Sequence, residues 1–290
     1  MNAFISELLR RGPVVTDGAW GTQLQARGLS VGEFPDSWNL TNAGKVAEVA
    51  QAYVNAGSRV ILTNTFGANR IRLTENGLGD QVAAINRAGV EISLSATKPA
   101  GAYVFASIGP TGKMLMTGDV TPEDLLAVFK EQAEALAAAG ADALVVETMS
   151  DPEEAKLAVQ AAKSTGKPVV ACMVFDSGKD KDRTMMGNTP EQVAQLMAEA
   201  GADVIGANCG QGIAGFVAIC QRLHAATDRP IWIKGNAGLP EMVDGRAVYR
   251  ETPETFSSHV PALLKAGASF IGGCCGTSPE FIAAVKARLG

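Results

Sequence analysis

Short apolar runs alternate with longer amphipathic segments along the whole chain. The runs are almost continuously hydrophobic, which is typical of parallel strands buried on both faces. The segments between them repeat apolar residues with helical spacing. The predicted strands are residues 14–17, 60–64, 103–108, 143–147, 169–175, 204–208, 231–234 and 270–273. The predicted helices are residues 43–56, 80–98, 122–139, 152–165, 190–200, 213–226, 253–266 and 279–289.

The residues that flank these helices repeat. Five helices begin with a capping residue followed by Pro and Glu, so each offers an oxygen to the first turn and an acid to the helix dipole. The caps are Thr121, Asp151, Thr189, Thr252 and Ser278. Four helices end in Ala-Gly, and glycine is the usual residue past a helix end. Eight βα units without a linker predict an α/β fold with a single (β/α)8 TIM barrel domain over residues 1–290, rather than an open doubly wound sheet.

Composition narrows the possible partners. A net charge of −5 argues against a nucleic-acid surface or an anionic membrane surface. No run reaches the ~18 apolar residues that a membrane span needs, and the N-terminus lacks a signal pattern. Five cysteines are too few for a disulfide framework in a chain of 290 residues. We therefore expect a cytoplasmic protein with reduced thiols.

Polar and thiol side chains cluster where the predicted strands end. In a barrel, the carboxyl ends of the strands form the face that carries the active site. The strand-end residues are Asp17, Asn64, Glu147, Cys209, Asn236, Cys274 and Cys275. Three long loops, residues 19–42, 64–79 and 176–188, follow strands and lie on the same predicted face. Phe34 and Trp38 of the first loop are positioned to cover a ligand.

Three of the five cysteines form a candidate metal site. Cys209 follows the sixth strand and Cys274–Cys275 follow the eighth, so one strand separates them. Three thiolates leave one of four zinc positions open, as in catalytic sites. The alternatives are small buried packing residues or a vicinal disulfide, because no Cys-x-x-Cys pair is present. Cys172 and Cys220 are predicted to be packing residues only.

Two acids, Asp17 and Glu147, end strands on roughly opposite sides of the predicted barrel. Paired carboxylates can act as acid and base or can hold a cation such as an ammonium group. The alternative is that each caps the following helix. His224 and His259 fall in predicted helices of the outer ring, and we assign neither of them a role.

Six short motifs, in order along nearly the whole chain, resemble those of the homocysteine S-methyltransferase family. That family includes the homocysteine-binding module of cobalamin-dependent methionine synthase and betaine–homocysteine methyltransferase. The motifs are residues 17–22 (Asp-Gly-Ala-Trp-Gly-Thr), 63–66 (Thr-Asn-Thr-Phe), 146–148 (Val-Glu-Thr), 206–210 (Gly-Ala-Asn-Cys-Gly), 235–240 (Gly-Asn-Ala-Gly-Leu-Pro) and 272–277 (Gly-Gly-Cys-Cys-Gly-Thr).

The resemblance implies a methyltransferase that converts homocysteine to methionine, with one zinc ion on the three cysteines. The thiol of homocysteine would be the fourth ligand. By the same resemblance, Asp17 and Glu147 would bind the amino group and the backbone around Gly18 and Ala19 the carboxylate. Asn64 would line the substrate site. Asn236 matches a residue that approaches zinc in some members when homocysteine is absent.

The methyl donor is the open part of this hypothesis. The chain stops after the eighth predicted helix, so we expect no corrinoid or folate module in it. Methylcobalamin, free or on a separate corrinoid protein, is the expected donor. S-Methylmethionine or betaine is the alternative.

Two other functions compete with this one. Lys234, at the end of the seventh strand, could form a Schiff base in an aldolase-like lyase. A non-catalytic subunit that docks a corrinoid protein or stores zinc would need no ammonium site, and Asp17 and Glu147 argue against it.

Overall fold

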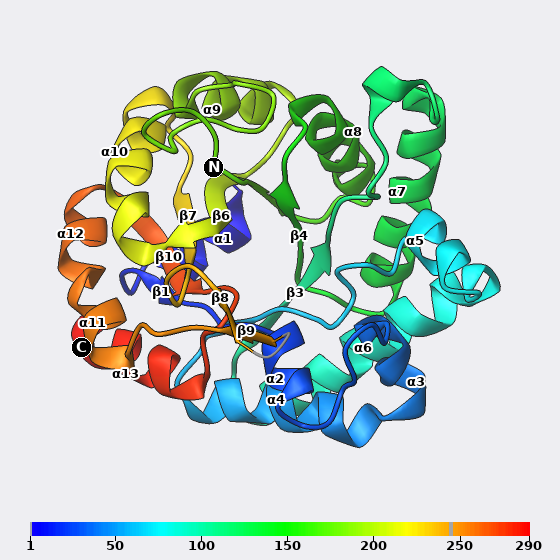
Figure 1. The fold of residues 1–290 in the computed structure, drawn as a ribbon, viewed down its shortest axis with the longest axis horizontal. Helices are drawn as coiled ribbons and strands as arrows, with labels where there is room; N and C mark the ends of the chain where they lie inside the picture. Colours follow the sequence, from blue (N-terminus) through cyan, green and yellow to red (C-terminus); the bar gives the residue numbers. More distant parts are fainter. Residues whose placement is uncertain (1, 244–245) are drawn as a thin grey trace.

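The computed structural model describes residues 2–243 and 246–290, and eight parallel strands form its centre. They are β1 (Val14–Val15), β2 (Val60–Ile61), β3 (Tyr103–Ile108), β4 (Ala143–Met149), β5 (Val169–Met173), β6 (Val204–Gly212), β7 (Ile231–Asn236) and β10 (Ala268–Gly273). They pair in the order β1-β10-β7-β6-β5-β4-β3-β2. The Arg59 N–H donates to Val15 O at 2.9 Å across the gap between β1 and β2. The predicted (β/α)8 barrel is confirmed, and its helices ring the strands in Figure 1.

The helices of the outer ring follow the predicted order with two differences. They are α4 (Ala43–Asn55), α6 (Val82–Thr97), α7 (Pro122–Ala138), α8 (Pro152–Lys163), α9 (Pro190–Glu199), α10 (Phe216–Ala226), α11 (Pro253–Ser258), α12 (Val260–Lys265) and α13 (Pro279–Leu289). The predicted helix 213–226 begins with a 3-10 turn, Ile213–Gly215. The predicted helix 253–266 is split at His259, because Pro261 has no N–H to continue the helical ladder.

Four of the five predicted helix caps form. The hydroxyls of Thr121 and Thr189 complete capping boxes, and Asp151 and Thr252 each accept a backbone N–H. The prediction for Ser278 is wrong, because its hydroxyl donates to the Glu280 carboxylate and makes no cap bond.

Three predicted strands are shorter than expected, because β5 ends at Met173 and both β1 and β2 end early. β1 ends at Val15 and β2 at Ile61, whereas the apolar pattern extends to residues 17 and 64. One carboxylate oxygen of Asp17 accepts the Leu62 N–H at 2.8 Å. A side chain therefore takes the place of a strand partner at this point of the barrel.

The core has two layers, one inside the barrel and one between strands and helices. Phe105, Trp232 and Phe270 pack against one another inside the barrel. The inner layer also contains Cys172, and Cys220 is buried under the helices, so both are packing residues as predicted.

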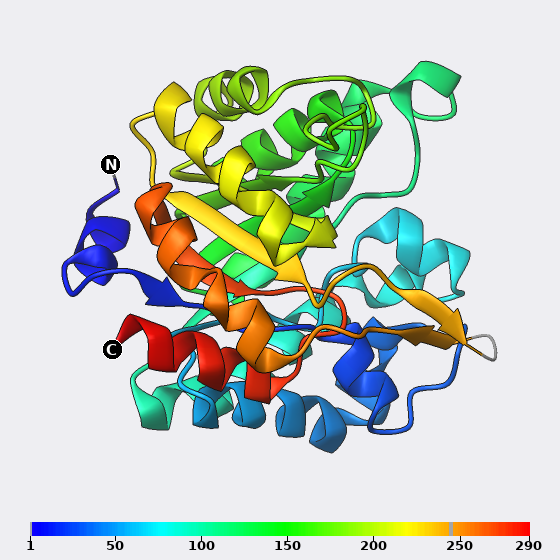
Figure 2. The same cartoon turned by 60° about the vertical axis from the view of Figure 1, so that its left-hand side comes forward.

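Two further elements lie at opposite ends of the barrel. Helix α1 (Ala3–Leu9) covers the amino ends of the strands and buries Ile5 and Leu8 there. The hairpin of β8 (Glu241–Val243) and β9 (Arg246–Val248), which we did not predict, projects at the other end (Figure 2). Among the helices of the described residues, none combines the length and hydrophobicity that crossing a membrane requires.

Candidate active site

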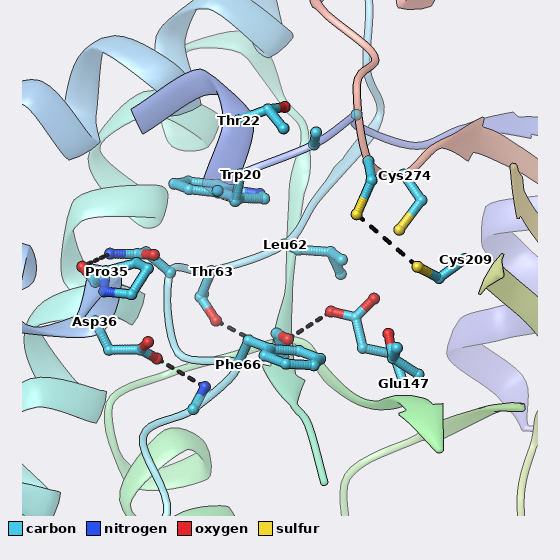
Figure 3. Close-up of a pocket in the computed structure, with 18 of the residues that line it drawn as sticks. Trp20, Thr22, Pro35, Asp36, Leu62, Thr63, Phe66, Glu147, Cys209 and Cys274 are labelled. Carbon is cyan, nitrogen blue, oxygen red and sulfur yellow. Dashed lines mark hydrogen bonds between the residues drawn. The ribbon is translucent and has the colours of Figure 1, made fainter. Parts of the chain in front are cut away.

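A cavity of about 400 Å³ opens among the loops at the carboxyl ends of the strands. Figure 3 shows Cys209 and Cys274 at one end of it and Pro35 and Asp36 at the other. We call these the thiol end and the loop end. Its walls come from the first strand turn, the loop after β2 and the ends of β4, β6, β7 and β10. The lining residues include Gly18, Ala19, Trp20, Phe34, Asn64, Phe66, Arg72, Glu147, Thr148, Cys209, Lys234, Cys274 and Cys275.

The three predicted cysteines converge at the thiol end. Their sulfur atoms all lie within 4.8 Å of one another, and the Sγ atoms of Cys209 and Cys275 are 3.9 Å apart. The thiols are free, so the vicinal disulfide alternative does not describe this structure. Two sulfurs at about 2.3 Å from a tetrahedral zinc ion are about 3.8 Å apart. The spacing of the thiols therefore fits a zinc ion with three sulfur ligands.

Backbone geometry directs these thiols toward one point. Cys209 has a φ of 59°, a left-handed conformation that side-chain-bearing residues rarely adopt. The Cys274 N–H donates to Gly235 O at 2.7 Å, and the Ala237 N–H donates to Cys275 O at 2.9 Å. These bonds attach the loop after β10 to β7. A glycine is required at Gly276, where φ is 80° and a Cβ would meet the Tyr249 ring at 2.2 Å.

The thiols also stabilise a shared negative charge. Hydrogen bonds from Cys274 and then Cys275 lower the pKa of Cys209 well below the usual thiol value. The bond with Cys209, together with burial, raises the pKa of Cys275 to about 11. Proton sharing of this kind favours one thiolate in the cluster before any ligand binds. The thiol end can thus accept a soft divalent cation.

Glu147 lies on the cavity wall beside the thiol end, where the sequence placed it. Only 8% of the residue is exposed. Its Oε1 accepts the Ser107 hydroxyl at 2.5 Å, and burial raises the pKa of the carboxyl above the usual value. The carboxylate therefore faces the cavity, as predicted.

Asp17 is placed differently from Glu147. It is fully buried, and within the described part of the chain the cavity walls include Gly18 but not Asp17. Its Oδ1 pairs with Lys234 Nζ at 2.5 Å, and its Oδ2 accepts Trp20 Nε1–H at 2.7 Å in addition to the Leu62 N–H. Both oxygens are therefore occupied by the protein, and binding of an ammonium group by Asp17 stays a prediction.

Lys234 is a buried member of the cavity wall. Burial disfavours its ammonium form, but the carboxylates of Asp17 and Glu147 outweigh burial and raise the pKa of Lys234. A Schiff-base lysine needs a free amine as its nucleophile. The ion pair with Asp17 opposes that form, so this geometry gives the lyase alternative no support.

Asn208 is a buried site residue to which we assigned no role from the sequence. Its Oδ1 accepts the Thr148 N–H at 2.8 Å, and its Nδ2 donates to Thr148 Oγ1 at 2.7 Å and to Glu147 Oε2 at 3.4 Å. Thr148 has a φ of 60°, so Asn208 joins two left-handed residues, Thr148 and Cys209. These hydrogen bonds of Asn208, which we call the Asn208 bracket, connect β6 to β4 across the strand between them, β5. Residue alternation along β6 from Val204 could have placed Asn208 inside the barrel.

The loop end is held by bonds between the two long loops. Asn64 Nδ2 donates to Pro35 O at 2.8 Å, and the Gly67 N–H donates to Asp36 Oδ1 at 2.9 Å. Burial raises the pKa of Asp36 to about 7. Asn64 therefore contributes to the wall as predicted, with its side chain amide engaged by the neighbouring loop.

Aromatic rings line the cavity between its two ends. Trp20 and Phe66 face it from opposite sides in Figure 3. Phe34 also lines the cavity. Of the two aromatic residues we expected to cover a ligand, Phe34 lines the cavity. Trp38 is instead buried and donates its Nε1–H to Glu33 at 2.6 Å.

The remaining predicted residues lie close to the site. Gly18 and Ala19 line the cavity, but the Ala19 N–H already donates to Thr277 Oγ1 at 3.1 Å. Asn236 is buried at the end of β7, and its Oδ1 has no hydrogen-bond partner among the described residues. An unpartnered buried oxygen beside three thiols is consistent with a site that accepts a further group.

Comparisons with known proteins agree with this arrangement. The profile of the homocysteine S-methyltransferase family matches residues 14–289. Methionine synthases of Mycobacterium tuberculosis (strain ATCC 25618 / H37Rv) and Mycobacterium leprae (strain TN) are each 28% identical over 98% of this chain, which spans 25% of their length. The metallated crystal structure of the homocysteine methyltransferase MmuM from Escherichia coli has a TM-score of 0.83 and 26% identity, covering 99% of this chain and 100% of that one.

Proposed function

Because the chain belongs to the homocysteine S-methyltransferase family, we propose that it transfers a methyl group to the thiol of homocysteine and forms methionine. The observation that carries the proposal is the convergence of three thiols at one end of a cavity whose wall also contains the carboxylate of Glu147. Cys209, Cys274 and Cys275 would hold one zinc ion. When bound, zinc would keep the acceptor sulfur as a thiolate, the nucleophilic form, at neutral pH.

The residues of the chain would then orient the acceptor. Glu147 would bind its ammonium group, because this carboxylate faces the cavity beside the thiols. Asn208 would hold Glu147 and the turn at Thr148 in register with Cys209. The acceptor sulfur would form a bond to the methyl carbon while the bond from that carbon to the donor breaks. Positioning of this kind contributes a large part of the barrier reduction.

For the donor, we propose a methylated corrinoid, free or carried by another protein. A cavity of about 400 Å³ has room for an amino acid but not also for a corrin ring, which would have to stand at its opening. The segments that follow β3, β5 and β7, on the same face of the barrel, carry exposed apolar side chains, including Met116, Met185 and Met242. Exposed apolar residues on one face are typical of a protein-binding surface.

A small onium donor is the second candidate. The rings of Trp20, Phe34 and Phe66 line the cavity, and aromatic faces attract cations. The Trp20 ring is held by its bond to Asp17.

The test is to supply the zinc-loaded protein with homocysteine and each donor separately. We expect loss of the methylcobalamin spectrum together with formation of methionine, measured by mass spectrometry. Rapid turnover of S-methylmethionine or betaine without demethylation of methylcobalamin would replace the donor and keep the acceptor. Absence of methionine with every donor would contradict the proposed function.

A further inference from the structure

Ser107 lies on the cavity wall beside Glu147, on the neighbouring strand β3. It follows Phe105 by two residues, and Phe105 packs inside the barrel, so Ser107 points inward as well. Only 1% of the residue is exposed, and it lines the cavity. Its hydroxyl donates to Glu147 Oε1 at 2.5 Å, a length typical of a hydroxyl bonded to a charged carboxylate. Ser107 therefore contacts the group to which we assign the acceptor ammonium.

Two threonines of the loop after β2 hold Ser107 in place. The Ser107 N–H donates to Thr63 Oγ1 at 3.0 Å, and Thr65 Oγ1 donates to Ser107 O at 2.7 Å. The two threonine oxygens are 2.6 Å apart. Each hydroxyl has one hydrogen, and that of Thr65 is used on Ser107 O, so Thr63 donates to Thr65. All three residues are buried, and this closed set of bonds fixes the backbone from which the Ser107 hydroxyl reaches Glu147.

Opposing influences act on the charge of Glu147. The ionisable groups that face it from the other strands and their ends are Asp17, Cys172, Cys209 and Lys234. Burial raises the pKa of Glu147, and the charges of Asp17 and Cys209 add to that rise. The Lys234 ammonium and the Ser107 hydroxyl act in the opposite direction, because both favour the ionised carboxylate. Lys234 is paired with Asp17, so the short hydrogen bond that Glu147 itself receives comes from Ser107.

The Glu147 carboxylate keeps room for a ligand. A carboxylate offers about four acceptor positions on its two oxygens. Among the residues that the structure describes, Oε1 accepts from Ser107 and Oε2 accepts from Asn208 at 3.4 Å. The short bond on Oε1 limits rotation of the carboxylate, and the long bond leaves Oε2 available. An ammonium group in the cavity can therefore reach a carboxylate whose orientation is already set.

We propose that Ser107 is a positioning residue, whose hydroxyl keeps the Glu147 carboxylate ionised and turned toward the ammonium group of the acceptor. This inference rests on the proposed function and adds a residue of β3 to the groups that select the acceptor. Without the hydroxyl, Glu147 would lose one of the groups that favour its charge and would take up a proton at higher pH. A neutral carboxyl group attracts ammonium far less, so selection of an amino acid over a thiol without ammonium would weaken as pH falls.

The experiment isolates the ammonium contact. Dissociation constants for homocysteine and for 4-sulfanylbutanoate, which lacks the ammonium group, are measured by calorimetry on the zinc-loaded protein between about pH 5 and about pH 8. Their ratio cancels the pH dependence that both thiols share through zinc. The preference for homocysteine should be present above the pKa of Glu147 and be lost as pH falls through it. In Ser107→Ala this loss should begin at higher pH than in wild type, and the preference should differ by about tenfold where the two curves are farthest apart.

A double variant tests whether Ser107 acts through Glu147. In Glu147→Gln protein the carboxamide does not titrate, so adding Ser107→Ala should change the preference by less than about twofold. Thr111→Ala is the matched control, because the Thr111 hydroxyl donates to another buried carboxylate, that of Glu154, at 2.6 Å. This control should leave the preference and its pH dependence unchanged.

Identical pH curves for wild type and Ser107→Ala would overturn the proposal. A full effect of Ser107→Ala in the Glu147→Gln background would also overturn it, because Ser107 would then act on the acceptor directly. An equal loss of affinity for both thiols at every pH would mark Ser107 as structural only. Misfolding is not expected, because Ser107→Ala keeps the backbone bonds to Thr63 and Thr65.

The two levels of inference fail in different ways. Selection that depends on Ser107 and Glu147, without methionine formation from any donor, would overturn only the proposed function. Methionine formation with identical pH curves in wild type and Ser107→Ala would overturn only the role of Ser107.

Discussion

The thiol end and the loop end of the cavity are held by different kinds of bond. At the thiol end, backbone bonds such as Cys274 N–H to Gly235 O attach the cysteines to neighbouring strands. At the loop end, side chains join one loop to another, as Asn64 does with Pro35 and Asp36 with Gly67. Strand ends position groups more precisely than loops do. The thiol end is therefore suited to fixed chemistry, and the loop end to variation in the donor.

The largest effect is expected from removing a thiol. Cys209→Ala should lose zinc and reduce turnover by about 10²- to 10³-fold or more, because loss of one charge-stabilising group from an active site costs that much. Zinc per chain and methionine formation are measured on the same sample. Cys220→Ala is the matched control, because Cys220 is buried under the helices, and it should keep both. Full zinc occupancy in Cys209→Ala would contradict the site.

Glu147→Gln should weaken the binding of homocysteine at the thiol end. Loss of the charged partner should weaken homocysteine binding by about ten- to a hundred-fold while zinc is retained. Glu154→Gln is a control, since Glu154 is buried and bonds Thr111 away from the thiols. If calorimetry gives the same affinity for wild type and Glu147→Gln, this carboxylate is merely structural.

Asn208→Ala tests whether the bracket positions the thiol end. It removes the bonds to Thr148 and Glu147, so the left-handed turns at Thr148 and Cys209 lose a common support. We expect turnover and zinc affinity to fall by about tenfold, as for losses of residues that orient metal ligands. Asn208→Asp keeps the acceptor for the Thr148 N–H and should recover part of both. A variant that lost stability but kept zinc affinity and turnover would refute the positioning role.

Asp36→Asn should have the smallest effect on turnover, because Asp36 lies at the loop end. Its clearer effect is on stability. The folded protein holds the proton up to about pH 7, whereas the ordinary value is 3.8, so the folded state binds more protons between these values. Stability should therefore fall as pH rises from about 4 to 7, by at most about 1.4 kcal/mol per pH unit from this group.

Urea unfolding at pH 5 and pH 7.5 measures this dependence. Asp36→Asn should be less sensitive to pH over the same range, and turnover should stay within a few-fold of wild type. An unchanged pH dependence in the variant would show that other groups are responsible.

The sequence predicted the repeating features of the fold, which are the apolar runs of the strands and the residues at the ends of strands and helices. Apolar runs located all eight strands, and the residues at their ends located the cysteines and Glu147. Local pattern failed where a side-chain hydrogen bond decides the outcome. Asp17 ends the ladder of β2 from 45 residues away, and Ser278 bonds Glu280 instead of capping its helix.

The same limit applies to the site. Alternation along the strands indicates that Asn208 and Lys234 face the inside of the barrel, but their partners, Thr148 and Asp17, are distant in the sequence. Both strands of the β8–β9 hairpin are three residues long and β8 is exposed, so neither carries the apolar run that marks a barrel strand. The sequence thus located the reactive side chains more reliably than the hydrogen bonds that orient them.

The pairing of β1 with β10 has a consequence for folding order. Val14 lies beside Phe270 in the sheet, so the ring closes through a contact between segments more than 250 residues apart. Contacts of such long sequence separation form late and slowly. Cys274 and Cys275 follow β10 directly, but they meet Cys209 through the pairing of β10 with β7 and of β7 with β6, which does not involve β1. Metal uptake during refolding can therefore come before the ring closes at β1, and would mark the assembly of β6, β7 and β10.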